Sequence, residues 1–112
     1  MNNSQIKACR DRQIRVLAAR KNGNEQEARS MYYRCVRFCL RVARYQEMRA
    51  NGPSHYSKWK WEWCKHEGKL IVSHWNRLNN ELMAYGLMWE CPGLYPILVD
   101  EDGSEAVELF WY

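Results

Sequence analysis

A mainly α fold with a small C-terminal β-hairpin is predicted by three features of this sequence. Apolar and basic residues recur every three or four positions over most of residues 5–85. Glycine-containing stops at 22–24 and 51–54 divide this region into helix-sized pieces. Two short apolar runs then flank an Asp-Gly pair near the C-terminus, which is typical of a hairpin. A length of 112 residues suits a single domain.

The first two helices are expected at residues 5–20 and 25–49, as an antiparallel helical hairpin. Asn3 or Ser4 can accept a hydrogen bond from the first free amides of the first helix. Gly23 can adopt the left-handed conformation that ends this helix, and Asn24 can cap the next one. The Gly52-Pro53 pair then ends the second helix.

The third helix is expected at residues 55–85 and contains one ambiguous stretch. Trp59, Trp61 and Trp63 alternate with charged residues, which is a strand pattern over a short window. A longer window favours a helix, because eight apolar or boundary positions follow a three-or-four spacing: Tyr56, Trp59, Trp63, Leu70, His74, Leu78, Leu82 and Tyr85. In the helix, Trp59 and Trp63 would face the core and Trp61 the surface. Gly68 marks the point where this helix could break or kink.

Residues 87–96 read as irregular, and a β-hairpin is expected at 97–111. The Asp102-Gly103 pair is a favoured two-residue turn. Pairing about it directs Leu98, Val107, Leu109 and Trp111 to one face, which should pack on the helices. Phe110 and Tyr112 would then lie on the other face of an edge strand, where exposed aromatic side chains usually mark an interface.

Charge is divided unevenly along the chain. Residues 1–52 hold twelve Lys and Arg against four Asp and Glu, a net +8, whereas residues 53–112 hold five against nine, a net −4. In the second helix four arginines form one stripe, with Phe38 and Tyr45 at its border: Arg34, Arg37, Arg41 and Arg44. Either an acidic partner covers this stripe, or the acidic C-terminal hairpin neutralises it within the fold or across a homodimer.

The cysteines and the remaining motifs indicate neither catalysis nor a metal site. Cys35 and Cys39, one turn apart, could supply two zinc ligands, with Cys64, His66, His55 or Cys91 completing the set. Buried free thiols are the favoured interpretation, because no second ligand pair has the usual spacing. Five cysteines without a disulfide pattern, and no apolar run of membrane-spanning length, predict a cytoplasmic protein that needs no cofactor and no membrane.

These observations lead to the hypothesis of a small non-enzymatic binding protein that acts by occupancy, as an inhibitor or adaptor. Its partner would be an acidic protein surface or a nucleic-acid-handling complex. Its small size resembles that of inhibitors that phages and mobile elements encode against host defences, and this analogy suggests a similar origin for the chain. The alternative hypothesis is direct binding of DNA or RNA by the 34–44 helix face. The predicted binding residues are Arg34, Arg37, Arg41, Arg44, Phe38, Tyr45, Trp61, Phe110 and Tyr112.

Overall fold

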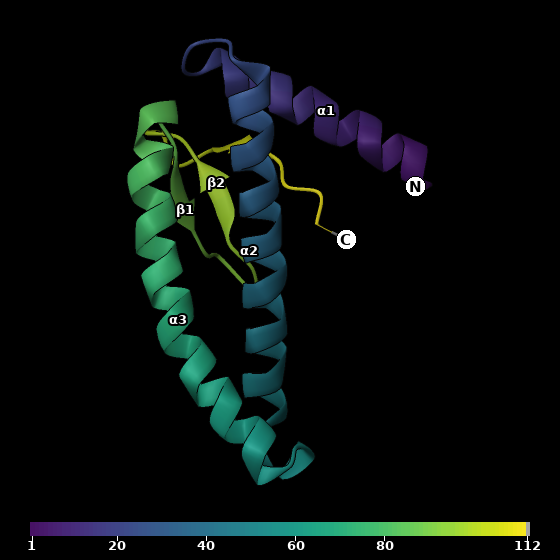
Figure 1. Cartoon of the computed structure of the whole chain (residues 1–112), viewed down its shortest axis with the longest axis vertical. Coiled ribbons are helices and arrows are strands. Elements are labelled where there is room, and N and C mark those ends of the chain that lie inside the picture. Colours follow the sequence, from purple (N-terminus) through teal and green to yellow (C-terminus); the bar gives the residue numbers. More distant parts are fainter. Residues whose placement is uncertain (112) are drawn as a thin grey trace.

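A computed structural model of the chain describes residues 1–111, so the prediction for Tyr112 lies outside the described residues. Helix α1 (Asn3–Ala19) leads into two long helices, α2 (Glu25–Asn51) and α3 (Lys58–Leu82), which run alongside each other (Figure 1). Short 3₁₀ helices, Pro53–His55 and Met83–Tyr85, precede and follow α3. Strands β1 (Met88–Glu90), β2 (Ile97–Val99) and β3 (Glu105–Val107) form an antiparallel sheet in chain order. The predicted mainly α fold, with a helical hairpin, a long third helix and a small C-terminal β element, is confirmed.

The boundaries of the first two helices follow local hydrogen bonding. Asn2, one residue before the predicted caps, begins α1: its side chain accepts from the Gln5 amide, and the Gln5 side chain accepts from the Asn2 amide. The turn into α2 was predicted correctly. Gly23 has a φ of +76°, and the Asn24 side chain accepts from the Glu27 amide at 3.1 Å. Figure 1 shows α1 diverging from α2 toward the N-terminus, so the hairpin is open at that end.

Helix α3 runs through all three tryptophans, which excludes a strand there. It begins later than predicted because the Ser57 side chain caps it, accepting from the Lys60 amide at 3.2 Å. The helix is also continuous through Gly68. A Cβ atom at that position would lie 2.5 Å from the Tyr45 hydroxyl of α2, so Gly68 lets the two helices approach closely.

The predicted orientation of the tryptophans was wrong. Trp59 and Trp63 are 77% and 46% exposed, whereas Trp61 is half-buried, stacked on Tyr56 with its ring under the Arg49 guanidinium. The buried stripe of α3 instead passes through Cys64, Glu67, Ile71, Leu78 and Leu82. Each residue turns a helix by about 100°, so a stripe set by these positions leaves 59 and 63 on an outer shoulder.

The sheet contains a strand that the sequence pattern did not predict. β1 pairs with β2 through Trp89 and Leu98, and the Trp89 amide donates to the side chain of Asn79 on α3 at 2.8 Å. Leu98 and Val107 pair and are buried, as predicted. Residues 100–104 connect the two strands, and the Asp100 amide donates to the Ser104 carbonyl at 3.0 Å, which leaves three residues, 101–103, in the turn. The Asp100 carboxylate accepts from the Asp102 and Ser104 amides, and Gly103 has a φ of +80°. The predicted two-residue turn was therefore wrong.

The segment after β3 leaves the sheet instead of extending it to residue 111. The Tyr32 hydroxyl donates to the Glu108 carbonyl at 2.9 Å and accepts from the Phe110 amide at 3.1 Å. Gln13 accepts from the Glu108 amide, and Arg10 donates to the Phe110 carbonyl at 2.7 Å. These side chains of α1 and α2 occupy backbone groups that a longer strand would need. Phe110 is buried as a result, so its predicted exposure was wrong.

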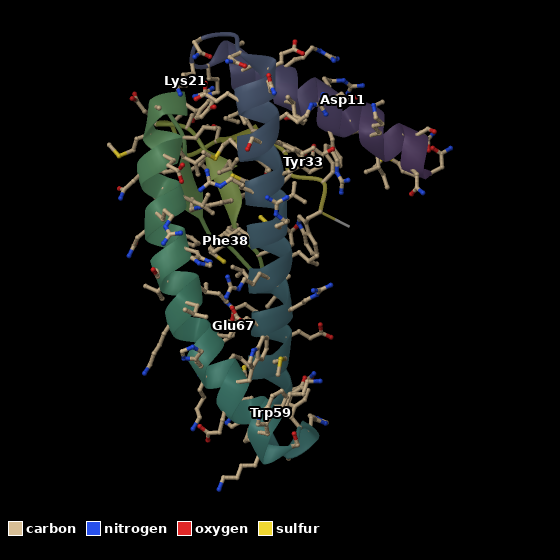
Figure 2. All side chains as sticks on the ribbon, in the orientation of Figure 1. Asp11, Lys21, Tyr33, Phe38, Trp59 and Glu67 are labelled. Atoms are coloured by element: carbon tan, nitrogen blue, oxygen red, sulfur yellow. The ribbon has the colours of Figure 1, made fainter. Side chains whose placement is uncertain are left out.

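The core lies where α2, α3 and the sheet meet. Phe38 of α2, Trp75 of α3 and Trp89 of β1 form an aromatic cluster with ring centroids 5.3 to 6.3 Å apart. Phe38 lies beside Arg34, Arg37 and Arg41, as predicted, but its side chain is buried, with 4% exposed. Figure 2 shows it between the two long helices.

Candidate functional site

The arginine stripe of α2 faces α3, and two of its four members are neutralised there. Arg34 forms a two-pronged ion pair with Glu81, with contacts of 2.8 and 2.5 Å. Arg41 pairs through Nε with Glu67. Both acids belong to α3. The acidic C-terminal hairpin makes no ion pair with the stripe within residues 1–111, so neutralisation by that hairpin within the fold was wrong.

The other two arginines of the stripe remain open. Arg37 and Arg44 are exposed, and neither forms a hydrogen bond or an ion pair with any residue that the structure describes. Arg77 of α3 is a third exposed cation without such a partner in residues 1–111. Arg77 was not among the predicted binding residues; it comes from the facing helix and adds to the open positive charge beside the stripe.

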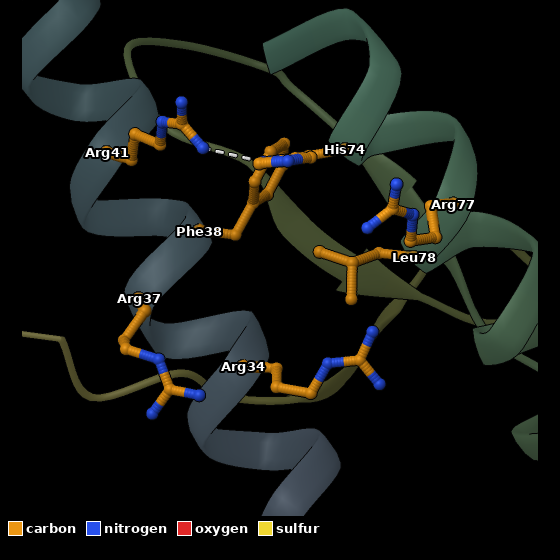
Figure 3. A pocket seen from close by; sticks show the side chains of 7 residues that line it. All are labelled: Arg34, Arg37, Phe38, Arg41, His74, Arg77 and Leu78. Carbon is orange, nitrogen blue, oxygen red and sulfur yellow. Dashed lines mark hydrogen bonds between the residues drawn. The ribbon is translucent and has the colours of Figure 1, made fainter. Parts of the chain in front are cut away.

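These side chains border two hollows that share Arg37 and Arg41, of about 260 and 430 Å³. We call the continuous depression the α2–α3 groove. Figure 3 shows its first hollow, with Arg34 and Arg41 extending from α2 toward α3 and Arg77 pointing back from α3. The groove is lined by Arg34, Arg37, Phe38, Leu40, Arg41, Arg44, Tyr45, Trp63, Glu67, His74, Arg77 and Leu78.

Apolar side chains line both hollows beside the arginines that form no ion pair in residues 1–111. Phe38 and Leu78 line the first hollow, and Leu40, Tyr45 and Trp63 line the second. Along α3, the exposed residues Trp59, Trp63 and Leu70 lie four and seven positions apart, and Arg77 lies seven positions beyond Leu70, so these residues share one shoulder of the helix. The groove thus combines unpaired guanidinium groups with large exposed apolar side chains, which is a composition enriched in protein interfaces.

A polar network crosses the middle of the groove. Arg41 donates to Glu67 through Nε and lies 2.6 Å from Nδ1 of His74 through Nη1. Arginine can only donate, so Nδ1 must accept, and the ring is neutral with its proton on Nε2. Burial, followed by the charges of Arg41 and Arg77, lowers the pKa of His74, and the opposing effect of Glu67 is smaller. Glu67 itself is 6% exposed and points between the helices (Figure 2).

Several groove residues could have been found from the sequence. Glu67, His74, Arg77 and Glu81 lie on one face of α3 at spacings of seven, three and four. These positions follow the same helical spacing as the arginine stripe but carry both acidic and basic side chains. This pattern indicates a helix that faces the stripe. Of the predicted residues outside the stripe, Phe38 and Tyr45 line the groove, whereas Trp61 and Phe110 lie elsewhere.

The thiols that were considered as zinc ligands are buried. Cys35 and Cys39 are completely buried, and burial raises the pKa of Cys35 to about 12 and that of Cys39 above its ordinary value. Within residues 1–111, no group of three His, Cys, Asp or Glu side chains is placed to hold a metal ion. In the same residues, no helix has both the length and the apolar character needed to cross a bilayer.

Comparison with protein-family models, with curated proteins and with solved structures gives no match for this chain.

Proposed function

We propose that this chain is a non-enzymatic binding protein that acts by occupancy, as an inhibitor or adaptor, and that its α2–α3 groove receives an acidic segment of a partner protein. One observation carries the proposal: Arg37, Arg44 and Arg77 border an apolar-lined groove, and none of the three forms an ion pair with a carboxylate in residues 1–111. Like charges gathered in this way repel one another, and an acidic partner relieves that repulsion.

The distribution of charge favours a protein over a nucleic acid as the partner. Glu67 and Glu81 place carboxylates among the arginines, so the groove is not a continuous cationic track. A phosphate backbone carries one negative charge per nucleotide and requires such a track. An acidic protein segment can instead match separate cations with separate carboxylates, and can place apolar side chains against Leu40, Tyr45 and Trp63.

The cysteines support action in a reducing compartment such as the cytoplasm. All five are free, and Cys91 is exposed without a partner thiol.

The test is capture of a partner from an extract of the cells in which the protein acts, with and without nuclease. Wild-type protein is compared with Arg37→Glu/Arg77→Glu, which breaks no ion pair within residues 1–111. The matched control is Arg12→Glu/Arg15→Glu, which makes the same charge change on exposed positions of α1. We expect one protein, identified by mass spectrometry, to be retained by wild type and control but lost about tenfold or more in the groove variant, as charge-assisted contacts are removed.

A mobility-shift assay on random DNA and RNA separates the alternative. Steep weakening of a wild-type shift with rising salt, together with loss of the captured protein after nuclease treatment, would overturn the proposal in favour of direct nucleic-acid binding. Equal capture by the groove variant and the wild type would also overturn it.

A further inference from the structure

We infer that the occupant of the α2–α3 groove is a single amphipathic α-helix that presents acidic residues and large apolar residues on one face. This inference rests on the proposed function and adds the conformation and residue pattern of the partner segment. It follows from the spacing of the two hollows, the source of the groove's lining and the order of charged and apolar side chains along it.

The two hollows are offset along both helices. On α2 the first hollow is bordered by residues 34–41 and the second by residues 37–45, whose midpoints differ by 3.5 residues, or about 5 Å. On α3 the first is bordered by residues 74–78 and the second by 63–67, about 11 residues or about 16 Å apart. Side chains three and four positions apart repeat along one face of a helix, so one helix laid along α2 and α3 can place different side chains of that face in the two hollows.

The lining favours a helix over an extended segment. All residues that border the two hollows belong to α2 or α3. An extended peptide gains most of its affinity from backbone hydrogen bonds to a strand edge, and none of the described residues that line this groove belongs to a strand. A helix satisfies its own backbone and needs only side-chain contacts, and its place between two paired helices resembles the third position of a helical bundle.

Charge and apolar surface define the register of the occupant. Arg77 and the flanking Arg37 lie at the first hollow, where they would meet a carboxylate. Leu40, Tyr45 and Trp63 lie at the second, where they would meet Leu, Met or aromatic side chains farther along the same face. Exposed Trp59 extends the apolar side further. From Trp59 to Arg77 the α3 shoulder covers eighteen positions, so an occupant of about 27 Å, or about five turns, would contact its whole length.

The experiment uses a displayed library of randomised peptides of about 18 residues. Peptides are selected for binding to immobilised wild-type protein and counter-selected on the Arg37→Glu/Arg77→Glu variant. We expect the enriched peptides to carry Asp or Glu on the same helical face as Leu, Met or an aromatic residue. A synthetic copy should gain helical circular dichroism on binding. Changing its acid to the amide, or Trp63→Ala in the protein, should each weaken binding about tenfold. Val72→Ala is the matched control, because Val72 is 60% exposed on the opposite side of α3, and it should leave affinity unchanged.

Each alternative outcome has a distinct meaning. Acidic, groove-dependent peptides that bind without helix formation, or with acid and apolar residues two positions apart, overturn the helix and leave the proposed function standing. Enriched peptides that lack acids, or that bind Arg37→Glu/Arg77→Glu equally, overturn both. A wild-type dimer in sedimentation velocity that becomes monomeric in this variant would identify a second copy as the occupant and overturn the inference.

Discussion

The Arg41–Glu67 ion pair lies in the middle of the α2–α3 groove, and its removal tests whether Glu67 is the buried partner of Arg41. The Glu67 side chain is 7% exposed and that of Arg41 is 31% exposed. In Arg41→Met, Glu67 loses its only ion-pair partner in residues 1–111 and becomes an uncompensated charge between two helices. Breaking one half of a buried pair costs about 3–5 kcal/mol of unfolding free energy. Water can enter from the open side of Arg41, so we expect about 3 kcal/mol.

The double variant Arg41→Met/Glu67→Met should lose far less unfolding free energy than the sum of the losses in its two single variants. Two apolar side chains of similar length replace the pair and leave no charge in the interface, so its net cost should be within about 1 kcal/mol of zero. The coupling energy from the double-mutant cycle should therefore exceed about 2 kcal/mol. The Arg34–Glu81 pair is the matched control. Its side chains are 35% and 42% exposed, so its coupling should stay below about 1 kcal/mol.

The assay is urea unfolding followed by tryptophan fluorescence. With a slope of roughly 1.5 kcal/mol per molar urea, Arg41→Met should lower the midpoint by about 2 M. If Arg41→Met is unfolded in buffer, recovery of the fold in the double variant gives the same answer. Additive effects at Arg41 and Glu67, or equal coupling in the two pairs, would refute the assignment of Glu67 as a buried partner.

Two further predictions concern other parts of the chain. Tyr32→Phe removes two hydrogen bonds to the backbone of residues 108 and 110, which should cost about 1–3 kcal/mol of unfolding free energy. Amide hydrogen exchange should then become faster at Phe110 far more than at Leu98. Unchanged exchange at Phe110 would contradict the anchoring role of Tyr32. The pKa of His74 is lowered in the fold, so below its ordinary value of 6.5 the unfolded chain binds more protons, and stability should fall as pH drops from that value through the lowered pKa. His74→Asn should flatten this part of the stability profile, whereas the same change at exposed His66 should not; identical profiles for both variants would contradict the network around Arg41.

The sequence alone determined the number, type and order of the helices. Gly23, Asn24 and the Gly52-Pro53 pair act through their own backbone preferences, which depend little on distant residues. The three-or-four spacing identified the helical character of the tryptophan stretch and the arginine stripe, since helical periodicity is a local property. The hairpin partners Leu98 and Val107 followed from alternation about a turn.

Tertiary structure decided which faces are buried and which charges are open. Glu81 and Glu67 lie 47 and 26 residues from the arginines that they neutralise, and spacing along the chain does not show which helix faces meet. The buried stripe of α3 is shifted by about one position from the predicted stripe. This shift exposes Trp59 and Trp63, which were predicted to face the core, because a helix turns by about 100° per residue. Strand β1 depends on β2 and on Asn79, and the end of β3 depends on Tyr32 and Gln13. A periodic pattern fixes the local geometry of each element, whereas the partner of each side chain is chosen by how the elements pack.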